Sequence, residues 1–436
     1  MNTKSHVTAL LLAAATLPAL SLGSSDDTAK SKEGRSGSSY MSMRQFLAEV
    51  AAENLDYAAQ RFNVSIAEAQ LVAARVSPNP TLTLGGARDV TSPSSQKLPS
   101  TPNVGLTQTL ELGGQRGART TAASINVSVT QAALEDFFRN LRASAANAYI
   151  DAVSGRLSAD QKHRSADALA QLAEANRKRL ELGDVGEVDY NQAAVDALQA
   201  RNDFFSATST AQSANIALSQ FLGTRRARET VILEDRLDTP DFGSTSESDL
   251  IAGALVRRPD LRAARGAVEA ARAGVRLAQA NRIPNLDVGA TFTHNSVSNN
   301  PIAPSPSWDS LGLTFAFPLP IFNSFRGEYL TAERTLAQTQ KTAASVEQRV
   351  ITDVRQSLAR YRVAQQRVSI FQSKGLAQAE QVYQARLQSY RSGASTLLDV
   401  LNAQKVANDV HLAYIDALTE RAKAWVALCQ STALSN

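Results

Sequence analysis

Two segments of the sequence combine a glycine with an aspartate a short distance further along the chain. The first contains Gly183 and Asp189, and the second contains Gly393 and Asp399. Glycine relieves the backbone where a helix ends, and a carboxylate near the start of the returning helix interacts favourably with the helix dipole. The residues alone therefore predict two helical turns in which Asp189 and Asp399 cap the second helix.

The residue types that usually carry catalysis or bind metals are scattered along the chain. They are His6, His163, His294, His411 and Cys429. No two of them are close in sequence, so neither a nucleophilic dyad nor a clustered zinc or copper site is indicated. Met41 and Met43 form a pair for which local packing is favoured over copper binding. The Gly-Gly pairs at 85–86 and 113–114 lack the spacing of phosphate-binding loops. We predict no enzymatic activity, no cofactor and no metal site.

The composition favours closely packed helices. Of the 436 residues, 43% are hydrophobic but only 6% are aromatic, and alanine is abundant. The formal net charge of +4 is dispersed, without a dense basic stripe, so nucleic acid is not an expected partner. The single cysteine excludes a disulfide within the chain.

The N-terminal residues have the pattern of an export signal. A lysine precedes an apolar run from Val7 to Leu22, and Gly23 follows at a spacing that a signal peptidase accepts. We expect residues 1–23 to be a signal peptide and residues 24–42 to be flexible. A membrane-anchoring helix is the alternative, which Pro18 and the short run disfavour. Beyond this run no window of about 18 apolar residues occurs, so we expect any membrane entry to use β-strands.

The chain is predicted to contain two copies of one plan. At a nearly constant offset, Pro78, Asn79, Gly183, Asp189 and Ala193 correspond to Pro284, Asn285, Gly393, Asp399 and Ala403. The order of the features is kept and the offset changes only at loops, which indicates a duplication. The first repeat covers residues 43–222, the second covers 248–436, and residues 223–247 link them.

Each repeat is expected to contain a helix, two strands around a loop, and a long helical hairpin. Alternating apolar residues predict the strands, and apolar residues three and four apart predict the helices. The expected bounds are helix 43–76, strands 81–88 and 104–111 and hairpin 117–222 in the first repeat, and helix 248–282, strands 286–295 and 310–317 and hairpin 327–430 in the second. A helix running from Gly117 to Gly183 would reach roughly 100 Å. The fold class is therefore mostly α with a small β part.

Four strands are too few to close a barrel, because the smallest membrane barrels have about eight. An open sheet edge in lipid would leave backbone groups unsatisfied. If the strands cross a membrane, the protein must therefore form an oligomer that shares one barrel. The alternative is a small soluble sheet that caps a helical rod.

The duplicated plan resembles the TolC family of outer-membrane efflux proteins over essentially the whole mature chain. Three sequence strings support the resemblance: LELGGQRGAR (Leu110 to Arg119), RRPDLRAA (Arg257 to Ala264) and YRSGASTLLDVLNAQ (Tyr390 to Gln404). The GGQRGAR string is similar to the heavy-metal branch, which exports cobalt, zinc, cadmium or copper. One departure is that some relatives carry an N-terminal lipid anchor, and no cysteine follows the apolar run here.

The resemblance implies a homotrimer in the outer membrane of a Gram-negative bacterium. Twelve strands would form one outer-membrane β-barrel in contact with lipid, continuous with a periplasmic α-helical barrel of twelve helices. Residues 223–247, with the strand-like Val231, Ile232 and Leu233, would belong to an equatorial belt. The lower end of the tunnel would dock on a periplasmic adaptor protein and a proton-driven inner-membrane pump.

By the family pattern the second turn lines the closed mouth of the tunnel. The implied periplasmic gate residues are Asp399, Asn402, Tyr390 and Arg391. The implied adaptor-contact turns contain Gly183, Gly186, Asp189, Gly393 and Leu397. Helix capping is the structural alternative for the two aspartates.

These features favour an exit duct of a tripartite efflux system that conducts heavy-metal cations or other small toxic compounds passively. One alternative is the same duct used for type I protein secretion. Another is a periplasmic coiled-coil scaffold without a channel. The genes that flank this one would distinguish the first two, and membrane fractionation would test the third.

Overall fold

The computed structural model describes residues 40–88, 100–223, 231–297 (without 235, 238, 241, 243 and 244) and 304–434. The predicted signal peptide, 1–23, and most of the predicted flexible segment, 24–42, lie outside these residues. None of the described helices is both long and apolar enough to cross a membrane.

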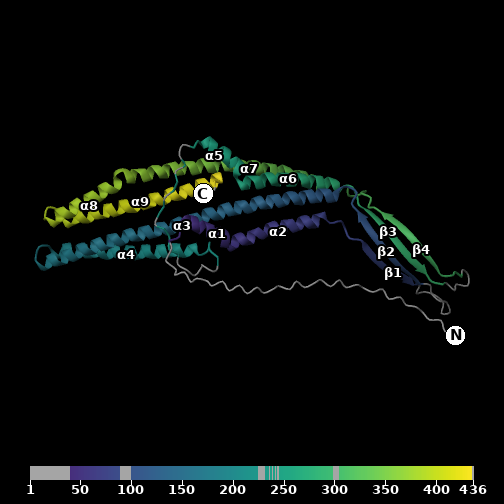
Figure 1. The fold of residues 1–436 in the computed structure, drawn as a ribbon, viewed down its shortest axis with the longest axis horizontal. Coiled ribbons are helices and arrows are strands. Elements are labelled where there is room, and N and C mark those ends of the chain that lie inside the picture. Colours follow the sequence, from purple (N-terminus) through teal and green to yellow (C-terminus); the bar gives the residue numbers. More distant parts are fainter. Residues whose placement is uncertain are drawn as a thin grey trace, which may run out of the picture. The chain divides into compact units, whose positions relative to one another are not determined.

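The described chain is mostly helical and has one small sheet (Figure 1). The first repeat contains α1 (Met43–Glu53), α2 (Leu55–Arg75), β1 (Thr81–Arg88), β2 (Ser100–Leu110), α3 (Gln115–Glu181) and α4 (Glu187–Leu218). The second contains α5 (Glu247–Arg257), α6 (Pro259–Ala280), β3 (Leu286–Asn295), β4 (Trp308–Ala316), α7 (Arg326–Ile370), the π-helical turn η1 (Phe371–Gly375), α8 (Leu376–Arg391) and α9 (Leu397–Thr432). This is the mostly α fold class with a small β part that the sequence predicted.

The four strands form one antiparallel sheet in the order β1-β2-β3-β4. The middle pair joins the two repeats, because β2 of the first repeat pairs with β3 of the second. In the described residues, β1 and β4 are the outer strands of the sheet. Each therefore has one edge without a strand partner, which leaves backbone groups available for pairing.

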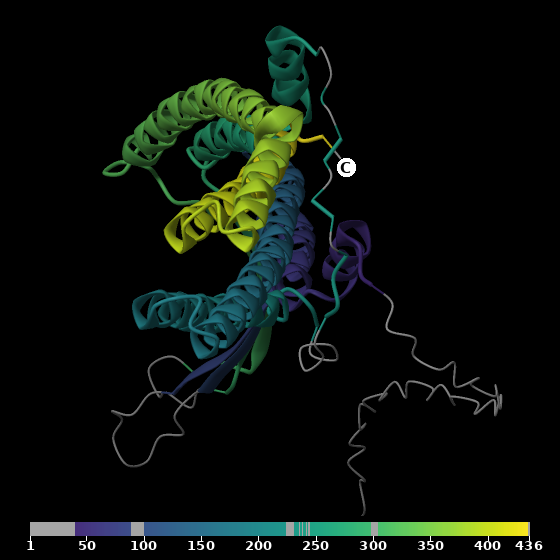
Figure 2. The same ribbon diagram turned by 90° about the vertical axis from the view of Figure 1, so that its left-hand side faces the viewer.

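The long helices lie side by side as two hairpins, one from each repeat. Helix α3 packs against α4, and α8 packs against α9 (Figures 1 and 2). Helix α3 also contacts α2, α6 and α9, so it connects the two repeats. At 67 residues it would be roughly 100 Å long by the helical rise of 1.5 Å per residue.

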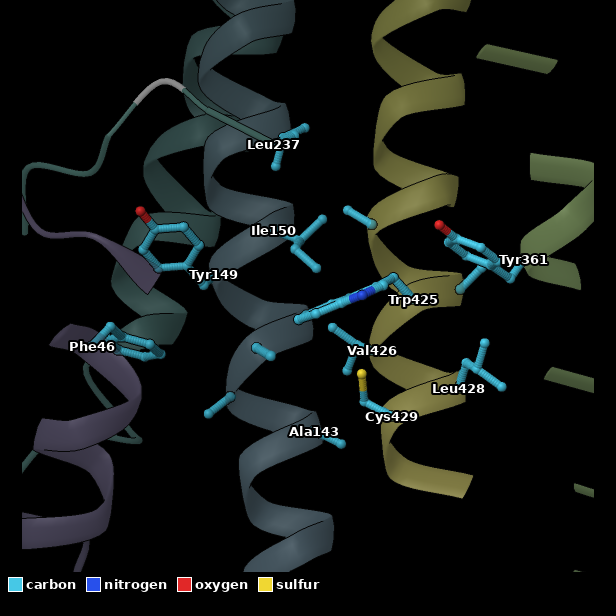
Figure 3. Close-up of a cluster of buried hydrophobic side chains, with 14 of the residues drawn as sticks. Phe46, Ala143, Tyr149, Ile150, Leu237, Tyr361, Trp425, Val426, Leu428 and Cys429 are labelled. Carbon is cyan, nitrogen blue, oxygen red and sulfur yellow. The ribbon is translucent and has the colours of Figure 1, made fainter. Parts of the chain in front are cut away.

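A hydrophobic cluster in the middle of the helices holds the repeats together (Figure 3). Tyr149 and Ile150 of α3 are buried there with Phe46 of α1 and Trp425 and Leu428 of α9. The linker contributes to the same cluster with Val231, Leu233 and Leu237. Its predicted strand is reduced to one isolated bridge between Leu233 and Met41, two residues before α1. The packing of these large side chains fixes the helices at their midpoint.

Each of the predicted first helices, 43–76 and 248–282, is in fact two helices. In the first repeat Asn54 has an extended backbone and is the N-cap of α2. Its side chain accepts a hydrogen bond from the amide of Tyr57. In the second repeat Arg258 has an extended backbone before Pro259, the first residue of α6. A proline disfavours the helical conformation of the residue before it, and asparagine is a strong N-cap, so both breaks follow from local chemistry.

Other elements also differ from the prediction. Strand β2 begins at Ser100 rather than 104, because Ser100 pairs with Arg88 at the end of β1. Strand β4 covers Trp308–Ala316 rather than 310–317. The long helix predicted after Gly327 is interrupted by η1, whereas its counterpart α3 is continuous. A π-helical turn adds one residue to the helix and shifts the faces on either side of it.

Candidate functional site at the helical turns

Both helical hairpins end in the same kind of turn. Gly183 and Gly393 have φ angles of 78° and 80°, in the left-handed region where glycine carries no side-chain penalty. The amide of Asp184 donates to the carbonyl of Arg179 at 2.8 Å, and the amide of Ala394 donates to that of Ser389 at the same distance. In each hairpin this hydrogen bond closes the last turn of the first helix. It gives a partner to a carbonyl that no amide of that helix reaches.

Asp399 lies in the first turn of α9 and caps its N-terminus. The hydroxyl of Thr396 accepts from the amide of Asp399 at 3.2 Å, while the amide of Thr396 donates to Oδ2 of Asp399 at 3.1 Å. The hydroxyls of Thr396 and Ser395 also donate to Oδ2, at 2.8 and 3.1 Å. These hydrogen bonds, led by that of the Thr396 hydroxyl, hold the pKa of Asp399 below its usual range. The arrangement is a reciprocal capping box.

Asp189 occupies the matching place in α4 but has different surroundings. The N-cap residue there is Gly186, which makes no side-chain cap, and Asp189 is exposed in the first helical turn beside Glu187. Its carboxylate can still interact favourably with the helix dipole. The two aspartates that the turn pattern predicted as equivalent helix caps are therefore held in different ways.

Tyr390, at the end of α8, is buried against the other hairpin. Its hydroxyl donates a hydrogen bond to Oδ1 of Asn176 on α3, over 2.5 Å. The Asn176 side chain donates in turn to the carbonyl of Leu172, at 3.0 Å. The guanidinium carbon of Arg179 lies 5.0 Å from the centre of the Tyr390 ring. One tyrosine thus makes a polar contact and a cation–π contact across the two hairpins.

A second hydrophobic cluster surrounds this hydrogen bond. Its buried members are Leu169, Ala193, Tyr390, Leu397, Val400 and Leu401. The sequence predicted Leu397 as an adaptor-contact residue, but its side chain is only 5% exposed and packs inside the cluster. Its neighbour Leu398 is 64% exposed. Leu397 therefore supports the turn from inside, because the first turn of α9 directs it toward α3 and α4.

The remaining predicted residues of the second turn are on the surface. Arg391 and Asn402 are exposed, and so is Gly393. Further along α9, the Gln404 amide donates to the Ser165 hydroxyl of α3 at 2.6 Å. The structure thus brings Tyr390, Leu397 and Asp399 together within one turn and leaves Arg391 and Asn402 on its outside.

Asn176 and Arg179, the two partners of Tyr390, were not predicted from the sequence. A signal for Asn176 was present, since it follows Leu169 and Leu172 at the spacing of a coiled-coil seam. A polar residue inside such a seam often sets the register between helices. Asn176 has no exposed surface, which is unusual for an asparagine and requires the hydrogen bonds that it makes.

The sheet has one apolar and one polar face. Residues that alternate along the strands and pair across them share a face. One face carries Leu82, Leu84, Val104, Leu106, Ala290, Phe292, Leu311 and Leu313. The other carries Thr81, Thr83, Gly105, Thr107, Gly289, Thr291, Gly312 and Thr314. The apolar face is uncovered, with Leu84 71% and Leu311 75% exposed.

The LELGGQRGAR string forms the junction between sheet and helices. Arg119 donates to the carbonyls of Ala74 and Val76 at the end of α2, each over 3.1 Å, and pairs with Glu111 at 2.8 Å. A cation is favourable at a helix C-terminus, where carbonyls lack partners. The Gln115 side chain donates to the carbonyl of Ile283 at 2.8 Å. The string therefore joins three segments that are distant in sequence.

The described residues include no group of three or more His, Cys, Asp or Glu side chains that could hold a metal ion. His163 pairs with Asp167 and His294 with Asp309, but each pair stands alone. The structure has a sheet with one polar and one apolar face. Its two hairpins are joined near their turns by the hydrogen bond between Tyr390 and Asn176 and by the hydrophobic cluster around it.

The chain is similar to proteins of known function and to solved structures. It is 24% identical to the cobalt-zinc-cadmium resistance protein CzcC of Cupriavidus metallidurans over 87% of this chain and 86% of that protein. A membrane protein from Pseudomonas aeruginosa has the same fold, with a TM-score of 0.75 and 21% identity over 89% of this chain and 93% of that one. The outer membrane channel CmeC of Campylobacter jejuni matches with a TM-score of 0.74 and 15% identity over 95% and 94% of the two chains.

The family model for outer membrane efflux proteins matches residues 46–224 and 250–434. These two stretches cover most of both repeats and leave out the linker. With its duplicated plan, its sheet and its paired hairpins, the chain belongs to the outer membrane efflux protein family.

Proposed function

We propose that this outer membrane efflux protein is the exit duct of a tripartite system and works as a homotrimer. The observation that carries the proposal is the sheet, which has an exposed apolar face, a polar face and two strands with unpaired edges. Three copies would pair β1 of one with β4 of the next and close a twelve-stranded barrel. Lipid would then contact the apolar face, and the polar face would line the channel.

The long hairpins would continue the channel as a helical tunnel in the periplasm. The tips would contact a periplasmic adaptor and a proton-driven inner-membrane pump. The exposed turn residues Gly183, Gly186, Asp189 and Gly393 are the proposed contact surface, with Leu398 in place of the buried Leu397. Solutes would pass without catalysis or a bound cofactor.

Heavy-metal cations are the proposed cargo. The support is the similarity to CzcC, a cobalt-zinc-cadmium resistance protein, over most of both chains. A duct for cations needs carboxylates that attract them without holding them, because tight binding would slow their release. Single carboxylates such as Asp399 fit that need better than a cluster of ligands.

The proposed gate is the second turn. Three copies of Asp399 around one axis would form a ring of negative charge, which Arg391 and cations could offset. Tyr390 would hold the closed arrangement through Asn176. Opening would then require the loss of a few contacts between the hairpins, an equilibrium of a few kcal/mol.

Three measurements test the proposal. The purified protein should be extracted by detergent as a trimer, and in planar bilayers it should form a channel with a low resting conductance. In its host, deletion of the gene should raise sensitivity to zinc, cobalt or cadmium, and re-expression should restore resistance. A monodisperse monomer that stays in water without detergent would contradict the shared barrel. Unchanged metal sensitivity alongside a functional channel would contradict only the cargo.

A further inference from the structure

The segment that joins β4 to α7 is unusually apolar for an exposed connection. In residues 317–322 the exposed fractions are 58% for Phe317, 64% for Leu319, 73% for Ile321 and 102% for Phe322. We call residues 317–322 the apolar linker. Isolated exposed apolar residues are common, but a contiguous group marks a surface that meets another molecule or a membrane.

The first repeat has no such feature at the same place. There, residues 111–114 lead from β2 to α3, and Leu112 is the one large apolar residue among them. The second repeat uses residues 317–325, more than twice the length. Since both connections serve the same purpose in the duplicated plan, the additional apolar residues need a separate explanation.

The path of the apolar linker is set by its own residues. Pro318 and Pro320 fix their own φ angles and disfavour the helical conformation of the residues before them. The amide of Ile321 donates to the carbonyl of Leu319 at 2.8 Å, so the chain turns at Pro320. At its end Phe325 has a φ angle of 56°, where the first repeat places Gly114 at 75°. A bulky residue in this region is strained. The Phe325 amide donates to the Asn323 side chain at 2.9 Å, which helps to hold this turn.

We propose that the apolar linker inserts into the boundary between lipid headgroups and acyl chains on the periplasmic side of the outer membrane. The inference rests on the proposed position of the sheet in that membrane. Its main support is continuity. The large apolar residues of β4, Leu311, Leu313 and Phe315, occupy alternate positions, and Phe317 and Leu319 continue the same alternation, with all five side chains exposed. The lipid-facing row thus extends past the end of β4.

Charge supports a lipid surface as the partner. Arg116 and Arg326 are exposed within the first helical residues after the sheet in the two repeats. Cations are unfavourable at a helix N-terminus because of the helix dipole, so an anionic partner would stabilise them there. Within the chain, Arg116 donates to the Ser77 hydroxyl at 3.4 Å, and this neutral partner does not balance its charge. Lipid phosphates at headgroup depth supply an anionic partner, and arginines at that depth are typical of membrane proteins.

A neighbouring subunit is a less suitable partner for this surface. In a shared barrel the next subunit pairs with the backbone edge of β4, while side chains that alternate with Leu311 and Leu313 remain on the outer face. Burial against the next subunit is therefore an outcome for the test to exclude.

Nitroxide side chains test the depth of the apolar linker. In a Cys429→Ala background, which removes the buried native cysteine, single cysteines are introduced as Phe322→Cys, Leu313→Cys and Val188→Cys. The trimer is reconstituted in phosphatidylethanolamine–phosphatidylglycerol vesicles. Collisions with oxygen, which enriches in lipid, are compared with those of a water-soluble nickel complex. Leu313 represents the sheet face, and Val188, 80% exposed in α4, represents the helical turns.

We expect the ratio of oxygen to nickel accessibility at position 322 to lie between those at 313 and 188, and to exceed the ratio at 188 several-fold. A ratio at 322 equal to that at 188, with 313 in lipid, overturns this inference and leaves the proposed function intact. A ratio at 313 equal to that at 188 overturns both. Protection of position 322 from both reagents, with spin–spin broadening between subunits, would place the apolar linker against a neighbouring copy. This result also overturns the inference.

The arginines provide an independent measurement. Raising the phosphatidylglycerol fraction should increase the ratio at 322 in the parent trimer. In the Arg116→Gln/Arg326→Gln variant the response should be lost, while the ratio at 313 stays unchanged. An equal response in both proteins would contradict the role of the two cations.

Discussion

The hydroxyl of Tyr390 on α8 lies 2.5 Å from Oδ1 of Asn176 on α3, so one buried hydrogen bond joins the two helical hairpins near their turns. Tyr390 is 8% exposed and Asn176 is fully buried. Because α8 and α3 belong to different repeats, this bond ties together the two halves of the duplicated plan at the proposed gate.

Replacing Tyr390 with Phe should loosen the closed mouth. The change removes one hydroxyl and leaves the buried oxygen of Asn176 without that donor, at a cost of about 1–3 kcal/mol. We expect a higher resting conductance in planar bilayers. Tyr414→Phe is the matched control, since the Tyr414 hydroxyl accepts a hydrogen bond from the exposed Gln372. Equal conductance of Tyr390→Phe and the parent would show that the hydrogen bond does not hold the gate.

Replacing Asp399 with Ala should weaken cation selectivity and the block by multivalent cations. The reason is the loss of a proposed ring of three carboxylates where the hairpins converge. Asp189→Ala is the control in the first repeat, and it should alter the conductance much less. The opposite ranking would mean that the roles of the two turns are reversed. If neither substitution has an effect, both aspartates are helix caps and the gate lies elsewhere.

The capping box of α9 should make the second turn sensitive to acid. Hydrogen bonds from Thr396 and Ser395 lower the pKa of Asp399 in the folded protein relative to the unfolded chain. Its contribution to stability is therefore present above the unfolded pKa and is lost as the pH falls through the folded value. Hydrogen exchange at the first turn of α9 should accelerate below the usual aspartate range. In Asp399→Asn this acceleration of hydrogen exchange at low pH should disappear. An acceleration of the same size in that variant would assign it to another titrating group.

Arg258 should be essential for the stability of the helical part. Its guanidinium is 4% exposed and pairs with Asp260 at 2.6 Å and with Asp353 of α7 at 2.9 Å. Arg258→Ala would remove a buried guanidinium from between the partly exposed carboxylates of Asp260 and Asp353. The loss of these charged hydrogen bonds should cost about 1–3 kcal/mol and lower the temperature at which the trimer unfolds. Arg262→Ala is the control, because Arg262 pairs with Glu135 at an exposed position and should contribute at most about 1 kcal/mol. If both variants lowered the unfolding temperature by a similar amount, Arg258 would contribute no more to stability than the exposed Arg262.

The purified trimer should not hold a metal ion tightly. The described residues contain no cluster of three candidate ligands. Calorimetric titration with zinc, cobalt and copper(I) should reveal no stoichiometric site tighter than roughly micromolar. A tighter site with a stoichiometry of one ion per trimer would indicate ligands from more than one subunit.

The elements with strong local patterns were predictable from the sequence. Alternating residues predicted β1 and β3 over 81–88 and 286–295, and those are the bounds of the two strands. Gly183 and Gly393 marked both turns, since a left-handed residue at a helix end favours glycine. The mostly helical fold class follows from such patterns, because each depends on residues only a few positions apart.

Other features depend on partners that are distant in sequence. The buried state of Leu397 and the pairing of Tyr390 with Asn176 required the packed hairpins. The start of β2 at Ser100 depended on its pairing with Arg88 of β1. The sequence by itself determined the mostly helical plan, the two turns and strands β1 and β3, since backbone preferences and side-chain periodicity act over one or two turns. Only the tertiary structure decided which of its polar side chains are buried and paired, because desolvation and hydrogen-bond geometry are set by segments that meet after folding.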